Sequence, residues 1–304
     1  MPAGWEALSN GKLAGATENK SGGTTTFHWL QDKPMATYLV SLVAGEFDKR
    51  QEKWTVPVDY YVPRGKAADI PRTFGRTTQM LDFFSTNIAP YPWAKYDQAM
   101  VDTFGGGMEN TSATTEGAAA ILDERDFEDR RWGTDSLIAH DEMAHQWFGD
   151  LITCADWRHT WLNEGFATYF EALWEEHARG RDVFDWQELR AGRGITSFPG
   201  RVAVVPQNGQ DENSAYGMIY NKGAGPSTWF AASLGTPVSG RPSNTTPGSS
   251  AIRPPPPAIL WRRSERPPGR TWNGSSINTY TSPAIPNSKS RGTTMPPTGC
   301  CISP

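Results

Sequence analysis

The sequence is poor in cysteine, in long apolar runs and in excess basic charge. Its three cysteines, Cys154 and the adjacent Cys300 and Cys301, are too few for a disulfide framework. No apolar run approaches the roughly 20 residues that span a bilayer, so we expect no membrane span. The formal net charge of -4 and the pI near 5.8 exclude a basic face, and we expect no nucleic-acid partner. These absences do not decide between a soluble cytoplasmic and an exported protein.

The first 63 residues have the composition of strands. Three segments are rich in β-branched and aromatic residues, which predicts strands at 24–29, 36–43 and 54–61. Around Pro63 the pattern changes, and residues 77–88 have helical spacing. We therefore expect a piece of a β-sheet domain over residues 1–63 and a second domain over residues 64–224.

Two further helices are predicted before Gly180. The first covers about residues 135–148, and the second ends near Gly180. The second has an apolar stripe at helical spacing, formed by Leu162, Phe166, Tyr169, Phe170 and Leu173. These two helices contain most of the residues that could do chemistry.

Beyond Ala224 the composition changes abruptly. Most of the 24 prolines lie there, and Glu265 is the only acidic residue. Neither helical nor strand periodicity continues, which is typical of a disordered Pro/Ser-rich tail over residues 225–304. A Pro-rich linear motif near residues 253–257 is a second interpretation, because such segments bind partner grooves in an extended form.

The candidate metal site lies in the segment Ile138–Gly149, which reads Ile-Ala-His-Asp-Glu-Met-Ala-His-Gln-Trp-Phe-Gly. A zinc peptidase needs two histidines one helical turn apart, a glutamate beside the first to act on the bound water, and a third ligand. Glu142 and His145 fit this pattern, and Glu164 follows on the next predicted helix with 18 residues between His145 and Glu164. The candidate zinc ligands are therefore His140, His145 and Glu164, with Glu142 as the catalytic base.

Asp141 disturbs this pattern because it adds a residue between His140 and Glu142. At roughly 100° per residue, histidines five positions apart differ by about 140° around a regular helix, against about 40° for four positions. A π-bulge would absorb the additional residue and return His140 to the metal. Alternatively Asp141, four positions before His145, would replace His140 as an oxygen ligand. A site that no longer binds zinc is the third interpretation.

The sequence resembles the aminopeptidase N family of gluzincin metallopeptidases in two motifs and in their spacing. These motifs are His-Gln-Trp-Phe-Gly at 145–149 and Trp-Leu-Asn-Glu-Gly-Phe-Ala at 161–167. The resemblance implies an α+β fold, in which a thermolysin-like zinc peptidase catalytic domain follows the last strands of a β-sandwich domain. It also implies one Zn2+ per chain. The implied activity is that of a metalloaminopeptidase, which hydrolyses N-terminal residues from peptide substrates with a free N-terminus.

A second motif, Phe-Gly-Gly-Gly-Met-Glu-Asn at 104–110, strengthens this resemblance. In the family, Gly-x-Met-Glu-Asn forms an edge strand along the substrate, which makes substrate-binding candidates of Gly106, Gly107, Met108, Glu109 and Asn110. By the same resemblance Glu109 is expected to pair with the α-amine of the peptide. Tyr220, in Tyr-Asn-Lys-Gly, matches the family's Tyr-x-Lys-Gly and is expected to donate a hydrogen bond to the oxyanion.

Both ends of the chain depart from the family pattern. Residues 5–11 and 34–47 resemble the last strands of the family's N-terminal β-domain, most of which is absent, and the resemblance ends near Ala224. If each codon is read from its third base, residues 226–236 can encode Leu-His-Met-Val-Arg-Arg-Glu-Leu-Gly-Asp, a continuation of a family helix. The tail is therefore expected to be disordered or translated out of frame. Such truncation, together with Asp141, is expected to impair activity, and the alternative function is a catalytically inactive peptide-binding remnant of the family.

Overall fold

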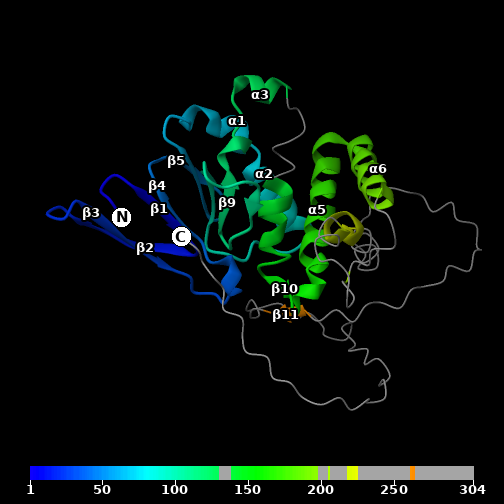
Figure 1. Cartoon of the computed structure of the whole chain (residues 1–304), viewed down its shortest axis with the longest axis horizontal. Helices are drawn as coiled ribbons and strands as arrows, with labels where there is room; N and C mark the ends of the chain where they lie inside the picture. The colour runs from blue at the N-terminus through cyan, green and yellow to red at the C-terminus, as the bar shows by residue number, and fades with distance from the viewer. Residues whose placement is uncertain (130–137, 198–204, 206–217, 225–260, 264–304) are drawn as a thin grey trace, which may run out of the picture. The chain divides into compact units, whose positions relative to one another are not determined.

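The computed structural model describes residues 1–129, 138–197, 205, 218–224 and 261–263 (Figure 1). The chain divides into two compact units. Every described residue belongs to the first unit, which comprises Met1–Ser249 and Leu260–Gly269. The expectations for the tail therefore lie outside the described residues, except at Trp261–Arg263.

The N-terminal strands form two small antiparallel sheets. Strand β1 (Glu6–Ser9) pairs with β4 (Leu42–Gly45), and β2 (Lys12–Asn19) pairs with β3 (Thr24–Leu30). The strand expected at 24–29 is thus confirmed as β3.

The segment 36–43 was expected to be one strand, and this is only partly right. Residues Thr37–Leu39 form a 3-10 turn, and β4 begins after it. The buried side chain of Asn10 explains the change, because its amide donates to the Leu39 carbonyl at 3.0 Å and its carbonyl oxygen accepts from the Ser41 N–H at 2.8 Å. These bonds replace the ladder that a strand would need here.

A five-stranded sheet carries one wall of the candidate site. Its strands, in spatial order, are β5 (Phe47–Lys53), β6 (Pro57–Pro63), β7 (Tyr96–Val101), β9 (Ala113–Gly117) and β8 (Gly107–Met108). The pairs β6–β7 and β7–β9 are parallel, whereas β5 and β8 are antiparallel edge strands. Strand β7 is buried along nearly its whole length, as expected for a parallel strand covered on both faces. The boundary expected after Pro63 falls inside this sheet.

The named helices around the sheet are α1 (Ile70–Phe74), α2 (Thr77–Asn87), α3 (Glu124–Asp129), α5 (Trp161–Arg179) and α6 (Arg181–Ser197). The predictions of α2 and of the end of α5 are confirmed. Gly180 ends α5 with a φ of 97°, which glycine adopts without steric cost. Helix α6, which runs beside α5 in Figure 1, was not predicted from the sequence. No described helix combines the length and the apolar character needed to cross a bilayer.

The predicted metal helix is not regularly wound. Residues 130–137 lie outside the described part, Ile138–Met143 form a π-helical turn, and Ala144–Gln146 form a 3-10 turn. Hydrogen bonds of a π-helix run from residue i to i+5, so residues five positions apart come about one turn apart. The π-helical winding coincides with the additional residue Asp141.

Aromatic side chains join residues 138–149, the segment of the predicted metal site and here called the metal turn, to helices α2 and α5. The ring of Phe148 stacks on Phe166 and Phe170 of α5, with centroid separations of 4.8 and 5.2 Å. Phe84 of α2 contacts Phe170 edge-on at 6.3 Å. The metal turn, α2 and α5 therefore share one apolar core.

Strand β11 (Trp261–Arg263) is the described part of the tail. It pairs antiparallel with β10 (Ile152–Cys154), which follows the metal turn. This strand lies within residues 225–304, which were expected to be disordered or translated out of frame.

Helix α5 meets the helical residues 218–224 backbone to backbone. A Cβ atom on Gly165 would lie 2.4 Å from the carbonyl carbon of Gly223, closer than any real Cβ contact. A Cβ atom on Gly223 would lie 3.1 Å from the Cα of Gly165. The pair of glycines sets the distance between α5 and the segment that contains Tyr220.

We predict that Gly165→Ala lowers the free energy of unfolding by about 1–3 kcal/mol, because an added methyl group overpacks this contact. Gly192→Ala in α6 is the matched control, since nothing lies within 4 Å of its added Cβ. This control should stabilise the protein by about 0.5–1 kcal/mol through helix propensity. Urea unfolding followed by circular dichroism measures both changes, and equal effects of the two substitutions would contradict the close contact.

Candidate functional site

Residues from separate segments of the chain meet around one cavity of about 230 Å³. Six predicted site residues line it, namely Gly107, Met108, Glu109, His145, Glu164 and Tyr220. They come from the edge of the sheet, from the metal turn, from the start of α5 and from residues 218–224. The fold therefore brings together residues that the sequence places more than 100 positions apart.

His145 and Glu164 form the charged centre of the cavity. The Nε2 atom of His145 lies 3.3 Å from Oε2 of Glu164. The other ring nitrogen, Nδ1, lies 2.9 Å from the carbonyl oxygen of Phe148. Because a carbonyl only accepts, Nδ1 carries the hydrogen, and this orients Nε2 toward Glu164.

Burial and charge act in opposite directions on His145. Its side chain is only 2% exposed, and burial alone lowers the pKa of the imidazole. The negative charges of Glu164 and then Glu109 outweigh burial and raise the pKa of His145 to about 10. The cavity therefore stabilises positive charge at this point, whether a proton or a metal ion supplies it.

The donor atoms at this point suit zinc, which binds imidazole nitrogen and carboxylate oxygen. Among the side chains that the structure describes, no group of three His, Cys, Asp or Glu residues is placed to hold a metal ion. The side chains of His140 and Asp141, the two candidates for a third ligand, lie outside the described part. Glu142 is described and is fully buried within the π-helical turn.

The Gly-rich motif forms the outer strand of the sheet, as the sequence predicts. In β8, Gly107 pairs with Glu116 and Met108 with Thr115 of β9. Glu109 follows β8 directly and lines the cavity. Gly106 precedes the strand with a φ of 94°, which favours glycine.

Asn110 does not line the cavity, although the sequence analysis made it a substrate-binding candidate. Its buried amide lies 3.4 Å from the carbonyl oxygens of both Leu39 and Val40. Its carbonyl oxygen accepts a hydrogen bond from Thr115 at 3.1 Å. In this structure Asn110 connects the end of the substrate motif to the N-terminal segment.

Gln146 is a fully buried residue that the sequence analysis missed. Its Oε1 accepts from the Ser112 N–H at 2.9 Å, while its Nε2 donates to the carbonyls of Glu109 at 3.2 Å and Glu142 at 3.3 Å. Ser112 has a φ of 61°, and its carbonyl accepts from the buried Lys95 ammonium at 2.8 Å. Gln146 thus joins the segment that follows β8 to the metal turn through main-chain groups.

Four further lining residues were also missed, namely Tyr38, Trp157, Thr160 and Asn163. Asn163 lies within the motif at 161–167 and directly precedes Glu164, so its place in the cavity could have been predicted from the sequence. Tyr38 lies in a segment with the composition of a strand, where an aromatic residue is typical of a core. Trp157, by contrast, is 62% exposed at the cavity.

Asp150 is a buried residue that is hydrogen-bonded to the backbone of His145. Its backbone N–H donates to the carbonyl of His145 at 3.0 Å, and its side chain is 1% exposed. Burial and then the negative charge of Glu109 raise the pKa of Asp150 well above its usual range. Burial and the charge of Glu109 thus both disfavour the ionised form of the Asp150 carboxyl group.

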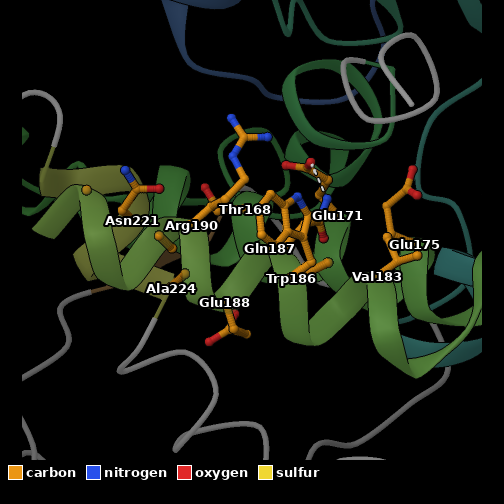
Figure 2. Close-up of a pocket in the computed structure, with 13 residues that line it drawn as sticks. Thr168, Glu171, Glu175, Val183, Trp186, Gln187, Glu188, Arg190, Asn221 and Ala224 are labelled. Atoms are coloured by element: carbon orange, nitrogen blue, oxygen red, sulfur yellow. Dashed lines mark hydrogen bonds between the residues drawn. The ribbon is translucent and has the colours of Figure 1, made fainter. Parts of the chain in front are cut away.

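A larger cavity, of about 460 Å³, lies between α5, α6 and residues 218–224 (Figure 2). Figure 2 shows Gln187 of α6 donating to Glu171 of α5, at 3.2 Å. None of the predicted site residues lines this cavity. The larger cavity is therefore not the candidate site. The smaller cavity is preferred because His145 and Glu164, whose donor atoms suit a metal ion, line it.

Residues 72–236, more than half of the chain, match the sequence profile of the Peptidase family M1 domain. The chain belongs to peptidase family M1. The match extends to residue 236, past Ala224, where the resemblance of the sequence motifs to the family was expected to end.

Aminopeptidases are among the M1 relatives of this chain. Aminopeptidase M1 of Arabidopsis thaliana is 35% identical over 180 residues, which are 57% of this chain and 20% of the relative. Endoplasmic reticulum aminopeptidase 1 of Homo sapiens is 35% identical over 143 residues, which are 45% of this chain and 15% of the relative. The chain thus spans a fifth or less of the length of these relatives.

A solved structure agrees with the M1 assignment. It is the crystal structure of a variant of an M1 zinc metallopeptidase from Deinococcus radiodurans bound to a Tyr-Ser-Ala substrate. The two chains are 29% identical with a TM-score of 0.61, over 73% of this chain and 48% of that one. The expected family resemblance and the expected α+β fold are confirmed.

We predict that Gln146→Met lowers the free energy of unfolding of this M1 chain by about 2–4 kcal/mol. Methionine has a similar length but breaks the four hydrogen bonds of the side chain, one of them from the Tyr91 hydroxyl at 3.3 Å, and removes a donor from two main-chain carbonyls. Each bond is worth about 1 kcal/mol. Gln51→Met is the control, because Gln51 is exposed and makes one bond of 3.3 Å to Asp59. Its effect should stay within about 0.5 kcal/mol. Equal urea midpoints for the two variants would show that the Gln146 bonds are unimportant.

Proposed function

We propose that this M1 chain carries the catalytic centre of a zinc-dependent aminopeptidase, which removes N-terminal residues from peptides. The observation that carries the proposal is the shared cavity of Glu109, His145, Glu164 and Tyr220. These side chains are a carboxylate suited to an ammonium group, two groups suited to a metal ion, and a phenol that can donate a hydrogen bond. The aminopeptidase names of the relatives support the same activity.

In this proposal His140, His145 and Glu164 hold one zinc ion, with Asp141 as the alternative to His140. The π-helical turn at Ile138–Met143 supports His140, because it brings residues five positions apart about one turn apart. His140 also keeps a neutral nitrogen ligand at a centre where carboxylates are already close. When bound, zinc supplies Lewis acidity, which lowers the pKa of water toward about 7 and polarises a carbonyl group.

The residues of the chain divide the remaining work. Glu142 accepts the proton of the attacking water and passes it to the leaving amine. Tyr220 donates a hydrogen bond to the oxyanion of the tetrahedral intermediate, and loss of such a donor typically costs about 2.7–4 kcal/mol of barrier. Phe148 holds the imidazole of His145 through its carbonyl.

The substrate lies along β8 in this proposal. Gly107 and Met108 form the outer edge of the sheet, with Gly106 directly before them, and an extended peptide can pair with the main chain there. Glu109 binds the α-ammonium group and so limits the reach of the site to one residue. Asn110 acts through the N-terminal segment rather than on the peptide.

We predict that Glu142→Gln lowers kcat for an aminoacyl p-nitroanilide by about 100- to 10,000-fold, because the amide cannot take the proton. The zinc content should stay unchanged, since Glu142 is not a ligand. Elemental analysis of the same preparation supplies this control. A variant that keeps wild-type turnover would exclude Glu142 as the base.

The two candidate third ligands are separated by paired substitutions. Asp141→Ala is expected to retain one zinc ion per chain, whereas His140→Ala is expected to lose it, because removal of a ligand opens the site. Inductively coupled plasma mass spectrometry on dialysed protein measures the ratio. The reverse result would make Asp141 the ligand. Wild-type protein that is folded but holds no zinc would instead support a catalytically inactive peptide-binding remnant.

A further inference from the structure

Tyr38 reaches the cavity from the N-terminal segment. It lies in the 3-10 turn Thr37–Leu39 and lines the same cavity as Glu109. Its hydroxyl lies 3.4 Å from Oε1 of Glu109 and 3.5 Å from the carbonyl oxygen of Gly149. The side-chain amide of Asn163 donates to the same hydroxyl at 3.5 Å. One oxygen atom is thus shared by three parts of the site.

The hydrogen of this hydroxyl has two acceptors in reach. A carboxylate accepts more strongly than a backbone carbonyl, so donation to Glu109 is favoured. Burial and then the charge of Glu109 raise the pKa of Tyr38 above its ordinary value, so the phenol keeps its proton. Asn163 occupies the acceptor side of the same oxygen and directly precedes Glu164 in α5. The phenol therefore lies between the carboxylate of Glu109 and the helix that carries Glu164.

The position of the Tyr38 ring is set by the fold. Its ring contacts Trp157 edge-on, with 4.9 Å between centroids and an interplanar angle of 73°. The carbonyl of the next residue, Leu39, accepts from Asn10 at 3.0 Å and from Asn110 at 3.4 Å. These contacts hold the hydroxyl in place before any ligand arrives.

We propose that Tyr38 is a positioning residue of an amine-binding subsite. It holds the Glu109 carboxylate at a fixed distance from α5, and so sets how far a primary ammonium group lies from the scissile bond. The ligand class is a primary amine. This inference rests on the proposed function, because it takes Glu109 as the amine-binding group.

The test measures binding rather than turnover, by calorimetry on the full zinc-loaded chain. The probe is L-leucinol, which has a free amine and no bond to hydrolyse, and N-acetyl-L-leucinol is the blocked probe. Tyr38→Phe should bind L-leucinol about tenfold more weakly, the effect of losing one hydrogen bond to a charged group. Glu109→Gln should bind it still more weakly. The double variant should match Glu109→Gln alone, because Tyr38 acts through Glu109.

Tyr60→Phe is the matched control, since Tyr60 donates to Glu52 at 2.5 Å outside the cavity. It should bind L-leucinol as wild type does. Only variants with wild-type circular dichroism are compared, and Tyr38→Leu replaces Tyr38→Phe if the latter does not fold. Unchanged affinity in Tyr38→Phe, additive losses in the double variant, or binding of the blocked probe by wild type would overturn the inference. So would the absence of L-leucinol binding by wild type.

A hydrolysis assay on the same preparations separates the two proposals. Suppose that the variants bind L-leucinol as predicted, with non-additive losses in the double variant, but that wild type hydrolyses no peptide. This result would refute the proposed activity and support the subsite. Hydrolysis by wild type with no loss of L-leucinol affinity in Tyr38→Phe would do the reverse. Where hydrolysis occurs, Tyr38→Phe should raise KM about tenfold and also lower kcat, since a displaced Glu109 carboxylate places the scissile bond less accurately.

Discussion

The buried imidazole of His145, held against the carboxylate of Glu164, is the interaction on which the site depends. Taking a carboxylate and an imidazole out of water is costly unless opposite charges meet. Here Glu164 and Glu109 together overcome the burial of His145 and raise its pKa to about 10. The cavity is therefore built to stabilise positive charge, and a divalent cation or a substrate ammonium group fits that requirement.

Neutral hydrogen bonds keep these charged groups at their distances. Gln146 binds main-chain groups of the segment after β8 and of the metal turn, and Tyr38 contacts both Glu109 and Asn163. The close approach of Gly165 and Gly223 fixes the segment of Tyr220 against α5. Such supporting contacts place residues from distant parts of the chain with the precision that catalysis requires.

The sequence predicted those features that follow from local patterns. The apolar stripe of α5 predicted that this segment is a helix, and the motif at 161–167, which includes Glu164, forms its first turns. The five-position spacing of His140 and His145 raised the possibility of π-helical winding, which the backbone of Ile138–Met143 adopts. The helix predicted over about 135–148 is described only from Ile138, where the π-helical turn is followed by a 3-10 turn at Ala144–Gln146.

The remaining features depend on tertiary contacts that no local pattern records. The 3-10 turn at Thr37–Leu39 exists because Asn10 binds carbonyl and N–H groups about 30 positions away. Tyr38 has the pattern of a strand residue, and only the fold places it beside Glu109. The parallel pairing of β6 with β7 likewise joins strands on both sides of the expected domain boundary.

X-ray absorption at the zinc edge, on the zinc-loaded full chain, tests the central claim most directly. The account predicts only nitrogen and oxygen neighbours at about 2.0–2.2 Å, with the multiple scattering of imidazole. Sulfur neighbours at about 2.3 Å would place the metal on cysteines instead of His145 and Glu164, and would contradict the account. The absence of bound zinc in folded protein would contradict it equally.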